Sequence, residues 1–312
     1  QVFVLLLFSY MFVQRHGVEA SLDRLLLGNL LLCLAIVVSL LAAPDLVLFV
    51  SETGAPRLTG RGIGEAGIFG TFAIILLLTT RRNISPLILL PLLGLLVTFL
   101  FFTLMRSGYI VVAVFLILAL IRLPLAKQLR WVLPLAVFSI VTALLVGLIP
   151  DLSKYRNPAS LYTLSDRFGL WAHFIDTILT ESPWLGRGFV SGVRVLGMEY
   201  HPRLGNGHSI FFEAFVGGGL IGLAMFIWLF LRLNLDAAWL FFHRKDSVSF
   251  AVVSLFMAVG LIGLIGGELD SGQVGFTFWF LVAALPYLRR QGRHERRKRR
   301  VRIPSNLGPQ AI

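Results

Sequence analysis

Long apolar runs separated by short polar segments fill the chain almost to position 290. The runs are rich in leucine and lack the period-two alternation of barrel strands, which favours membrane-spanning helices of about 20 residues. The chain is apolar from Gln1 onward, so we expect an N-terminally truncated chain that lacks its first spans. Nine spans are predicted: 1–13, 25–50, 63–80, 85–104, 108–121, 131–150, 209–231, 248–267 and 274–288.

The composition of the chain excludes a soluble protein. Of the 312 residues, 57% are hydrophobic and 14% are charged, and the mean hydropathy is +0.83. A soluble protein carries about 25% charged residues, so too few are present to cover a water-exposed surface. The apolar fraction and the single cysteine also exclude disordered and disulfide-scaffold classes. The predicted fold is an all-α polytopic transmembrane helical bundle.

The positions of lysine and arginine predict the orientation of the spans. The segments on one side of the membrane carry nineteen of these residues, and the segments on the other side carry nine. The richer side is predicted to be cytoplasmic, so one large loop faces outward. We therefore expect six spans in 1–150, an outward loop at 151–208, three spans in 209–288 and a basic cytoplasmic tail at 289–312.

The net charge of +12 is concentrated in this tail. Residues 289–302 hold nine Lys or Arg and one acidic residue, Glu295. A basic segment directly after an apolar span is typical of a cytoplasmic end that faces anionic lipid headgroups. The expected partners of the tail are therefore membrane lipids, and nucleic acid is not expected.

An amphipathic helix is predicted inside the outward loop, over Asp166–Thr180, with Ser165 as its N-cap and Pro183 after its end. A helix with Trp and Phe on one face is expected to lie along the membrane interface. The following segment, Gly186–Gly192, is predicted to be a flexible turn. The apolar positions of the helix fall at helical spacing and are Leu170, Trp171, Phe174, Ile175 and Ile178.

Charged groups at the rims of spans are the first candidates for chemistry, because an intramembrane charge is costly unless it serves a function. Arg106 lies between two apolar runs with almost no loop around it. It would either snorkel to the interface or bind an anion. Arg167 lies in the first turn of the predicted loop helix, where the helix dipole disfavours a cation. It is either neutralised by Asp166 or held for an anionic ligand.

His208 lies at the outward mouth of span 209–231, where it is either a polar helix cap or a base. Glu268 and Asp270 mark another outward mouth, and a polar rim explains them equally well. The sequence has no P-loop and no His/Cys spacing for a metal, so no metal or cofactor is expected. Weaker candidates, for which solvation or the orientation of a neighbour is the simpler explanation, are His201, Arg203 and Glu213.

Four pieces of the chain, taken in order, resemble motifs of the O-antigen ligase/polymerase superfamily. The family patterns are Arg-x-x-Gly, Ser-Arg-Ser-Gly, Ser-x-Arg followed by Pro-x-x-Gly-x-Gly, and a His-Asn start followed by Gly-Leu-Ile-Gly. Met105 and Ser209 stand where the family has Ser and Asn. The matching pieces, which span about residues 57–230, are Arg57-Leu-Thr-Gly60, Thr103–Tyr109, Ser165–Trp171 with Pro183-Trp-Leu-Gly-Arg-Gly-Phe189, and Gly207–Gly222.

This resemblance implies a glycosyltransferase of the bacterial inner membrane whose active site faces the periplasm. The family moves a glycan from undecaprenyl diphosphate to an acceptor hydroxyl, either on another lipid-linked glycan or on lipid A–core, without a metal. Arg106 and Arg167 are then expected to stabilise the departing diphosphate, and His208 to activate the hydroxyl in one inverting displacement. The expected substrate-binding residues are Arg57, Arg187, His201, Arg203 and Glu213.

A transporter or flippase of lipid-linked oligosaccharide is the alternative. A flippase would also need arginines on the outward side. In addition, it would need positively charged residues along a path deep in the membrane. The interiors of the predicted spans carry almost no charge, which favours the enzyme. The enzyme further predicts that Arg106, Arg167 and His208 line one outward cavity with the loop helix as its lid. A non-catalytic scaffold predicts no such cluster.

Overall fold

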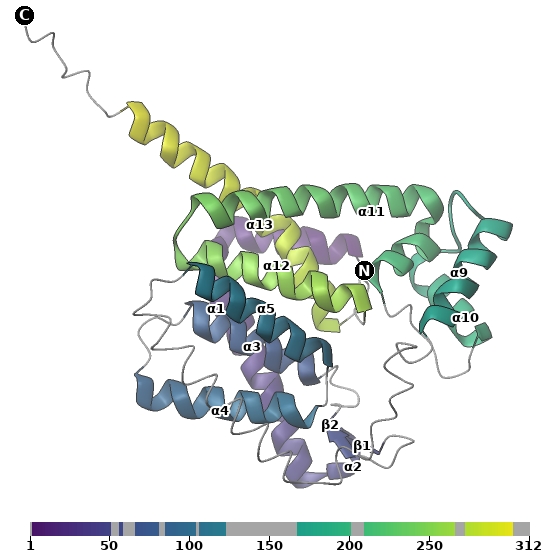
Figure 1. Ribbon diagram of the computed structural model, residues 1–312, viewed down its shortest axis with the longest axis horizontal. Helices are drawn as coiled ribbons and strands as arrows, with labels where there is room; N and C mark the ends of the chain where they lie inside the picture. Colours follow the sequence, from purple (N-terminus) through teal and green to yellow (C-terminus); the bar gives the residue numbers. More distant parts are fainter. Residues whose placement is uncertain are drawn as a thin grey trace, which may run out of the picture.

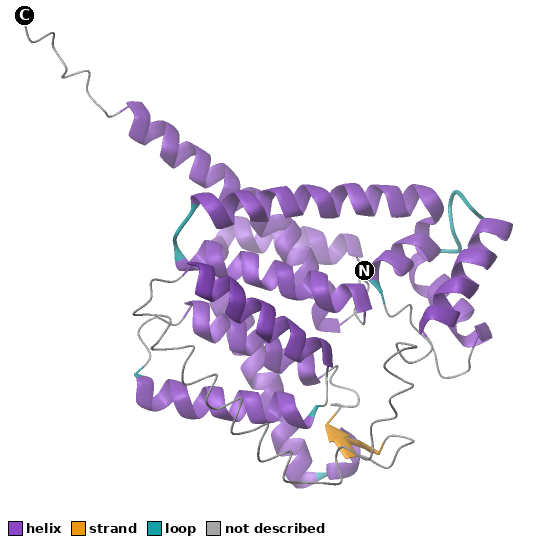
Figure 2. Cartoon of the chain, viewed as in Figure 1, coloured by secondary structure: helices purple, strands orange, loops and turns teal. Residues whose placement is uncertain are grey.

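The computed structural model describes residues 2–50, 56–58, 66–80, 85–103, 106–122, 167–200, 209–265 and 272–301. Within these ranges the chain is helical apart from one small hairpin (Figure 2). The predicted helical bundle is therefore confirmed. The elements are α1 (Val2–Ala42), α2 (Pro44–Val47), β1 (Leu48–Val50), β2 (Pro56–Leu58), α3 (Ala66–Thr80), α4 (Pro86–Phe102), α5 (Arg106–Arg122), α9 (Arg167–Glu181), α10 (Phe189–Tyr200), α11 (Ile210–His243), α12 (Ser247–Ile265) and α13 (Gly272–Val301).

Three of the described helices are long and apolar enough to cross a membrane, namely Leu6–Ala42 of α1, all of α11, and Ser247–Leu264 of α12. Helices α3, α4 and α5 are shorter apolar helices. Six predicted spans correspond to α3, α4, α5, α11, α12 and α13, and the span predicted at 131–150 lies outside the described residues. The protein is therefore a helical membrane protein.

The first two predicted spans form one helix, α1, which bends at Gly17 instead of ending in a loop. Gly17 has a φ of 79°, in the left-handed region that glycine enters without steric cost. The span predicted at 25–50 ends as a helix at Ala42, and residues 48–50 pair with residues 56–58 in an antiparallel hairpin. Its register sets Phe49 opposite Arg57.

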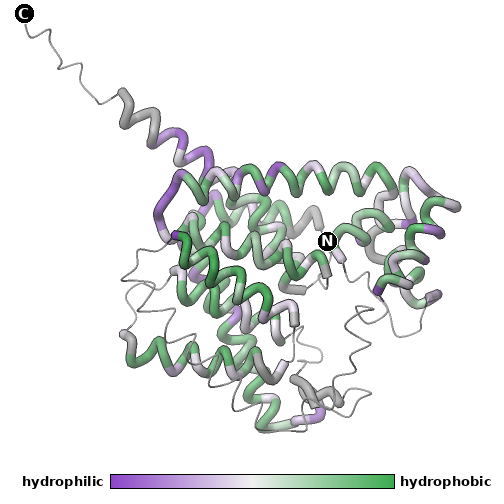
Figure 3. The backbone as a smooth tube through the Cα atoms, in the orientation of Figure 1, coloured by the Kyte–Doolittle hydropathy of each residue, from purple (hydrophilic) through white to green (hydrophobic). Residues whose placement is uncertain are grey.

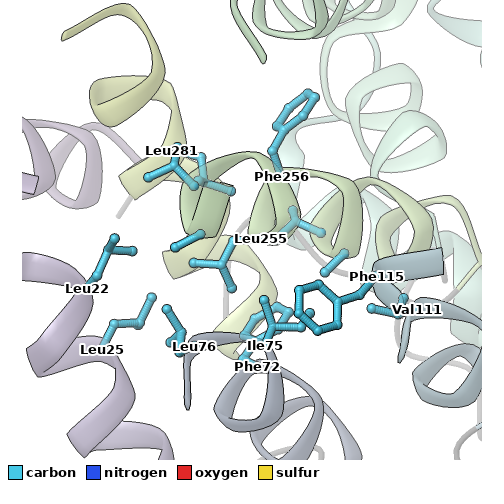
Figure 4. Close-up of a cluster of buried hydrophobic side chains, with 14 of the residues drawn as sticks. Leu22, Leu25, Phe72, Ile75, Leu76, Val111, Phe115, Leu255, Phe256 and Leu281 are labelled. Atoms are coloured by element: carbon cyan, nitrogen blue, oxygen red, sulfur yellow. The ribbon is translucent and has the colours of Figure 1, made fainter. Parts of the chain in front are cut away.

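The core lies where α1, α3, α5, α12 and α13 meet (Figure 4). Helix α3 is buried on all sides, as expected for a helix that is apolar around its whole circumference. Its Phe72, Ile75 and Leu76 lie among side chains of the neighbouring helices, including Leu255 and Leu281. Apolar side chains of α4 and α11 stay exposed, as lipid contact requires. Figure 3 shows that both helices are largely hydrophobic along their length.

Polar groups gather at the end of the bundle where α5 ends and α11 connects to α12 (Figure 1). The Arg122 side chain donates to the backbone carbonyls of Arg244 and Asp246. The Asp236 side chain is fully buried and pairs with Arg289 of α13. Residues predicted to share the cytoplasmic side are thus neighbours in the fold. Arg106 begins α5 and so lies at the opposite end of this helix from Arg122.

Asp246 caps α12 at this polar end. Its carboxylate accepts hydrogen bonds from the Ser249 backbone N–H at 2.8 Å and from the Ser249 hydroxyl at 2.9 Å, and it pairs with Arg244. Burial alone would raise the pKa of Asp246, but these hydrogen bonds and the Arg244 charge hold that pKa below its ordinary value. Its contribution to stability is therefore present above its unfolded-state pKa of about 4, and is lost as the pH falls through the lower folded-state pKa.

We expect Asp246→Ala to lower the free energy of unfolding by about 1 kcal/mol at pH 7, because the helix loses its cap. We expect Asp246→Asn to lose less at pH 7, since an amide oxygen still accepts the Ser249 N–H. Both variants should lose less stability than the wild type on acidification. Thermal unfolding in detergent at pH 7 and pH 3 checks this, and equal acid sensitivity in all three proteins would contradict it.

Candidate functional site

Helices α9 and α10 and the first turns of α11 form a layer of their own at the end of the bundle where α11 begins (Figure 1). The predicted loop helix is confirmed as α9. Its buried face, expected to lie on the membrane, is instead covered by α10 and α11, and Ile175 is exposed. The buried cluster of this layer consists of Leu170, Phe174 and Ile178 of α9, Val193 and Leu196 of α10, and Phe215 and Val216 of α11.

Stacked rings also join α9 to α11. The Trp171 ring lies on Phe212 with centroids 4.8 Å apart and an interplanar angle of 12°. Offset stacking of this kind adds about 1 kcal/mol beyond the area that it buries. The start of α9 is therefore held against the start of α11 by side chains.

The turn Ser182–Gly188 binds the backbone of α11 at a break in that helix. Helix α11 leaves helical geometry at Gly219, where φ is 62° and ψ is −154°. Backbone groups around the break pair with the turn instead of with their own helix. We call this contact, between Ser182–Gly188 and Val216–Ile221, the clasp. Its bonds run from the amides of Arg187 and Gly188 to the carbonyls of Val216 and Gly217 (2.8 and 3.2 Å), and from the amides of Leu220 and Ile221 to the carbonyls of Pro183 and Trp184 (2.8 and 3.4 Å).

The clasp requires glycine on both of its sides. A Cβ at Gly186 would lie 2.4 Å from the carbonyl oxygen of Val216, and a Cβ at Gly219 would lie 2.5 Å from that of Trp184. Both glycines also have positive φ. The motif piece Pro183–Phe189 and the motif piece Gly207–Gly222 are therefore in direct backbone contact. The prediction of a flexible turn at 186–192 is wrong, because the amides of Arg187 and Gly188 are bonded to α11 and residues 189–192 begin α10.

Arg187, a predicted substrate-binding residue, joins the ends of α9 and α10. Its guanidinium forms ion pairs with Glu181 of α9 and with Glu199 of α10 at 3.8 Å, and its side chain is 29% exposed. Exposed ion pairs contribute at most about 1 kcal/mol, so the pairing orients Arg187 more than it stabilises the fold. An anionic substrate at Arg187 would have to compete with both carboxylates.

The same layer contains two further predicted residues. Arg167 is the first residue of α9 and is partly exposed. Glu213 lies in the first turn of α11 and is 5% exposed, where the helix dipole stabilises a carboxylate. The layer thus contains all three residues, but Arg167 lies at the start of α9 whereas Arg187 pairs with Glu181 at its end.

Other predicted residues fall outside what the structure describes. The side chains of Arg57 in β2 and Arg106 at the start of α5 belong to this group. The convergence of Arg106, Arg167 and His208 therefore stays a prediction. Wholly outside the described residues are His201, Arg203, His208, Glu268 and Asp270.

His173 of α9 is not among the residues predicted to form the site. Its ring lies 5.8 Å from the Tyr200 ring of α10, and its Nε2 is buried without a hydrogen-bond partner in the described part of the chain. An unpaired buried nitrogen is costly, which makes it a candidate for contact with water or substrate. His173 stands out only through its contact with Tyr200 of another helix, so the helical periodicity of α9 alone could not identify it. Among the described residues, no three His, Cys, Asp or Glu side chains are grouped to hold a metal ion.

A family model matches the middle of the chain. Residues 91–227 match the model of the family described as O-antigen ligase. The matched segment runs from α4 to the middle of α11 and contains the whole clasp. It also includes Arg106, Arg167 and His208. No curated protein matches the chain.

Proposed function

We propose that this chain, whose residues 91–227 match the O-antigen ligase family, transfers a glycan from undecaprenyl diphosphate to an acceptor hydroxyl. The domain itself indicates an O-antigen ligase-type role in polysaccharide biosynthesis. The acceptor is a second lipid-linked glycan or lipid A–core. The observation that carries the proposal is that one family match includes the clasp and all three residues assigned to the reaction.

The clasped layer supports a shared site for two of these residues. Helix α9 begins at Arg167, and α11 begins two residues after His208. The buried cluster, the Trp171–Phe212 stack and the clasp all fix α9 against α11. A transfer site needs helices that are held in fixed positions, because small displacements of the reacting groups lower the reaction rate.

In the proposed reaction, the His208 imidazole takes the proton of the acceptor hydroxyl. The hydroxyl oxygen then attacks the anomeric carbon and forms the new glycosidic bond. The bond from that carbon to the diphosphate oxygen breaks, and the electron pair leaves with undecaprenyl diphosphate. One displacement inverts the anomeric configuration.

Arg106 and Arg167 are assigned to the leaving group. The diphosphate gains negative charge as its bond to the sugar breaks, and guanidinium groups fixed in advance stabilise that charge. Arginine suits this task because its planar fork donates two hydrogen bonds to two phosphate oxygens. The remaining predicted contacts to the glycans come from Arg57, Arg187, His201, Arg203 and Glu213.

We expect Arg106→Lys to lower transfer roughly tenfold or more, since an ammonium cannot make the paired hydrogen bonds of a guanidinium. The measurement is the amount of polymerised or ligated glycan on a gel, at matched protein level. Arg232→Lys is the control, because Arg232 of α11 lies at the opposite, polar end of the bundle beside Asp236. Wild-type transfer by Arg106→Lys would favour a snorkelling arginine instead.

A flippase of the same lipid-linked glycan is the alternative, and proteoliposomes distinguish the two. With donor and acceptor together, the enzyme converts lipid-linked donor into a new glycoside. A flippase moves the donor between leaflets and leaves its covalent structure unchanged. Movement of intact donor without a new glycoside would reject the proposed transfer.

A further inference from the structure

Helix α9 has a second apolar face, which stays exposed while α10 and α11 cover the first. Its side chains lie at the i, i+4, i+7 and i+11 spacing of one helix face and are Phe168, Ala172, Ile175 and Leu179. We call these four residues the outer face of α9. Its three large side chains are between 43% and 56% exposed. An exposed apolar patch of this kind marks a surface that contacts a partner or a membrane.

The outer face continues into a surface that already faces lipid. The turn that follows α9 adds Trp184 and Leu185, which are 64% and 72% exposed. In the clasp, the Ile221 amide donates to the Trp184 carbonyl. Ile221 begins an exposed apolar stripe along α11 that includes Met225 and Trp228. Because α11 is long and apolar enough to cross a membrane, this stripe contacts acyl chains.

The length of α11 places the clasp at a boundary of the hydrocarbon core. The buried pair of Asp236 with Arg289 lies at the polar end of the bundle, and charged groups avoid the middle of a bilayer. Helix α11 rises about 30 Å over the roughly 20 residues from Asp236 to Val216, which is the thickness of the core. Val216 belongs to the clasp. Trp184 therefore lies at the depth where tryptophan is enriched in membrane proteins.

The start of α9 lies at a similar depth. The Phe168 ring contacts the Trp171 ring edge to face, with centroids 5.7 Å apart, and Trp171 stacks on Phe212 of α11. Phe212 is one helical turn, about 6 Å, beyond Val216 along α11. The headgroup region extends about 6 Å beyond the hydrocarbon core on each side. Both ends of the outer face are thus at the level of the membrane interface.

We propose that the outer face of α9, together with Trp184 and Leu185, is buried in the lipid leaflet at the end of the bundle where α11 begins. The occupant is the bilayer itself, because the outer face extends the lipid-facing stripe of α11. Helix α9 then lies along the membrane on a face that shares only Ile175 with the face predicted from the sequence. The proposal does not depend on the proposed transfer, since none of these residues is assigned to that reaction.

Fluorescence of the full chain in phosphatidylcholine nanodiscs tests this contact. Cys33, the single cysteine, is replaced with alanine, and a nitrobenzoxadiazole probe is attached to Leu179→Cys, Thr180→Cys or Met225→Cys. Thr180 is the matched control, because it is exposed and lies about 100° around α9 from Leu179. Met225 is the reference for lipid contact. The quenchers are phosphatidylcholine with a doxyl group on its acyl chain and iodide in the water.

We expect the doxyl lipid to quench the probe at Leu179→Cys roughly twofold or more over that at Thr180→Cys, and close to that at Met225→Cys. Iodide should quench Thr180→Cys in preference to Leu179→Cys. Equal quenching of these two probes by iodide would overturn the proposal, because the outer face would then lie in water. Protection of Leu179→Cys from both quenchers would overturn it too, because protein, such as a second copy of the chain, would then cover the face.

Hydrogen exchange gives a second readout that needs no attached probe. Leu179→Gln replaces an apolar side chain of the outer face with a polar one of similar helix propensity. It should speed the exchange of α9 amides in nanodiscs roughly tenfold, as expected for the loss of one buried leucine. Thr180→Gln should exchange at about the wild-type rate. Equal exchange rates in the two variants would overturn the proposal.

Discussion

Replacing His208 with alanine is expected to lower glycan transfer roughly 100-fold or more, because the reaction loses its general base. An alcohol is a weak nucleophile until its proton is removed, and alanine cannot accept that proton. Insertion into the membrane should be unchanged, since the substitution leaves the apolar segment of α11 intact. The readout is polymerised or ligated glycan on a gel, with the membrane fraction of the protein measured in parallel.

Two other histidines serve as controls for this experiment. His243→Ala should retain the transfer activity, because His243 lies in the last turn of α11 and is assigned no part in the reaction. His173→Ala tests the unpaired ring on α9. If His208→Ala made normal glycan and His173→Ala lost transfer, the general base would be His173 of α9 and not His208.

Gly219→Ala is expected to lower the free energy of unfolding by about 3 kcal/mol and to abolish transfer. Alanine in this φ/ψ region, which is essentially restricted to glycine, costs about 2 kcal/mol, and its Cβ would also displace the carbonyl of Trp184 and break hydrogen bonds of the clasp. Transfer fails because α9 then loses its fixed position against α11. Thermal unfolding in detergent and the glycan gel measure the two effects.

Gly17→Ala separates backbone strain from the loss of the clasp. Gly17 has a positive φ of 79°, as Gly219 has one of 62°. Unlike at Gly219, a Cβ at Gly17 would meet no atom within 4 Å. This variant should lose about 2 kcal/mol and keep most of its transfer activity. A Gly219→Ala protein as stable and as active as Gly17→Ala would show that the clasp has no positioning role.

The apolar runs predicted most of the helices, because a segment inside a bilayer can pair its own backbone N–H and C=O groups only by forming a helix. They failed where polar residues continue a helix. The predicted span ended at residue 231, yet α11 continues as a helix to His243. Leu233, Ala237 and Leu240 are buried at helical spacing there, and Asp236 is paired with Arg289 across to α13. The hydrophobic pattern of one segment cannot predict a partner such as Arg289, which lies far away in the sequence.

The site was predicted unevenly for a similar reason. Side-chain periodicity identified α9, whose buried residues repeat every four positions. It did not identify α10, where Gly192 and Gly197 interrupt the pattern, nor the clasp, which is built from backbone groups. The glycines at 186 and 219 were the available signal, because glycines in two separate motifs can mark a close approach of two backbones.

The most direct test of the central claim is a transfer reaction with purified protein, a donor glycan on undecaprenyl diphosphate and two acceptors, lipid A–core and a second lipid-linked glycan. The measurement is the undecaprenyl diphosphate released for each new glycosidic bond, with and without a chelator. We predict one released lipid for each bond, with one of the two acceptors, at the same rate in both conditions. Consumption of neither acceptor, with the donor left intact, would contradict the account.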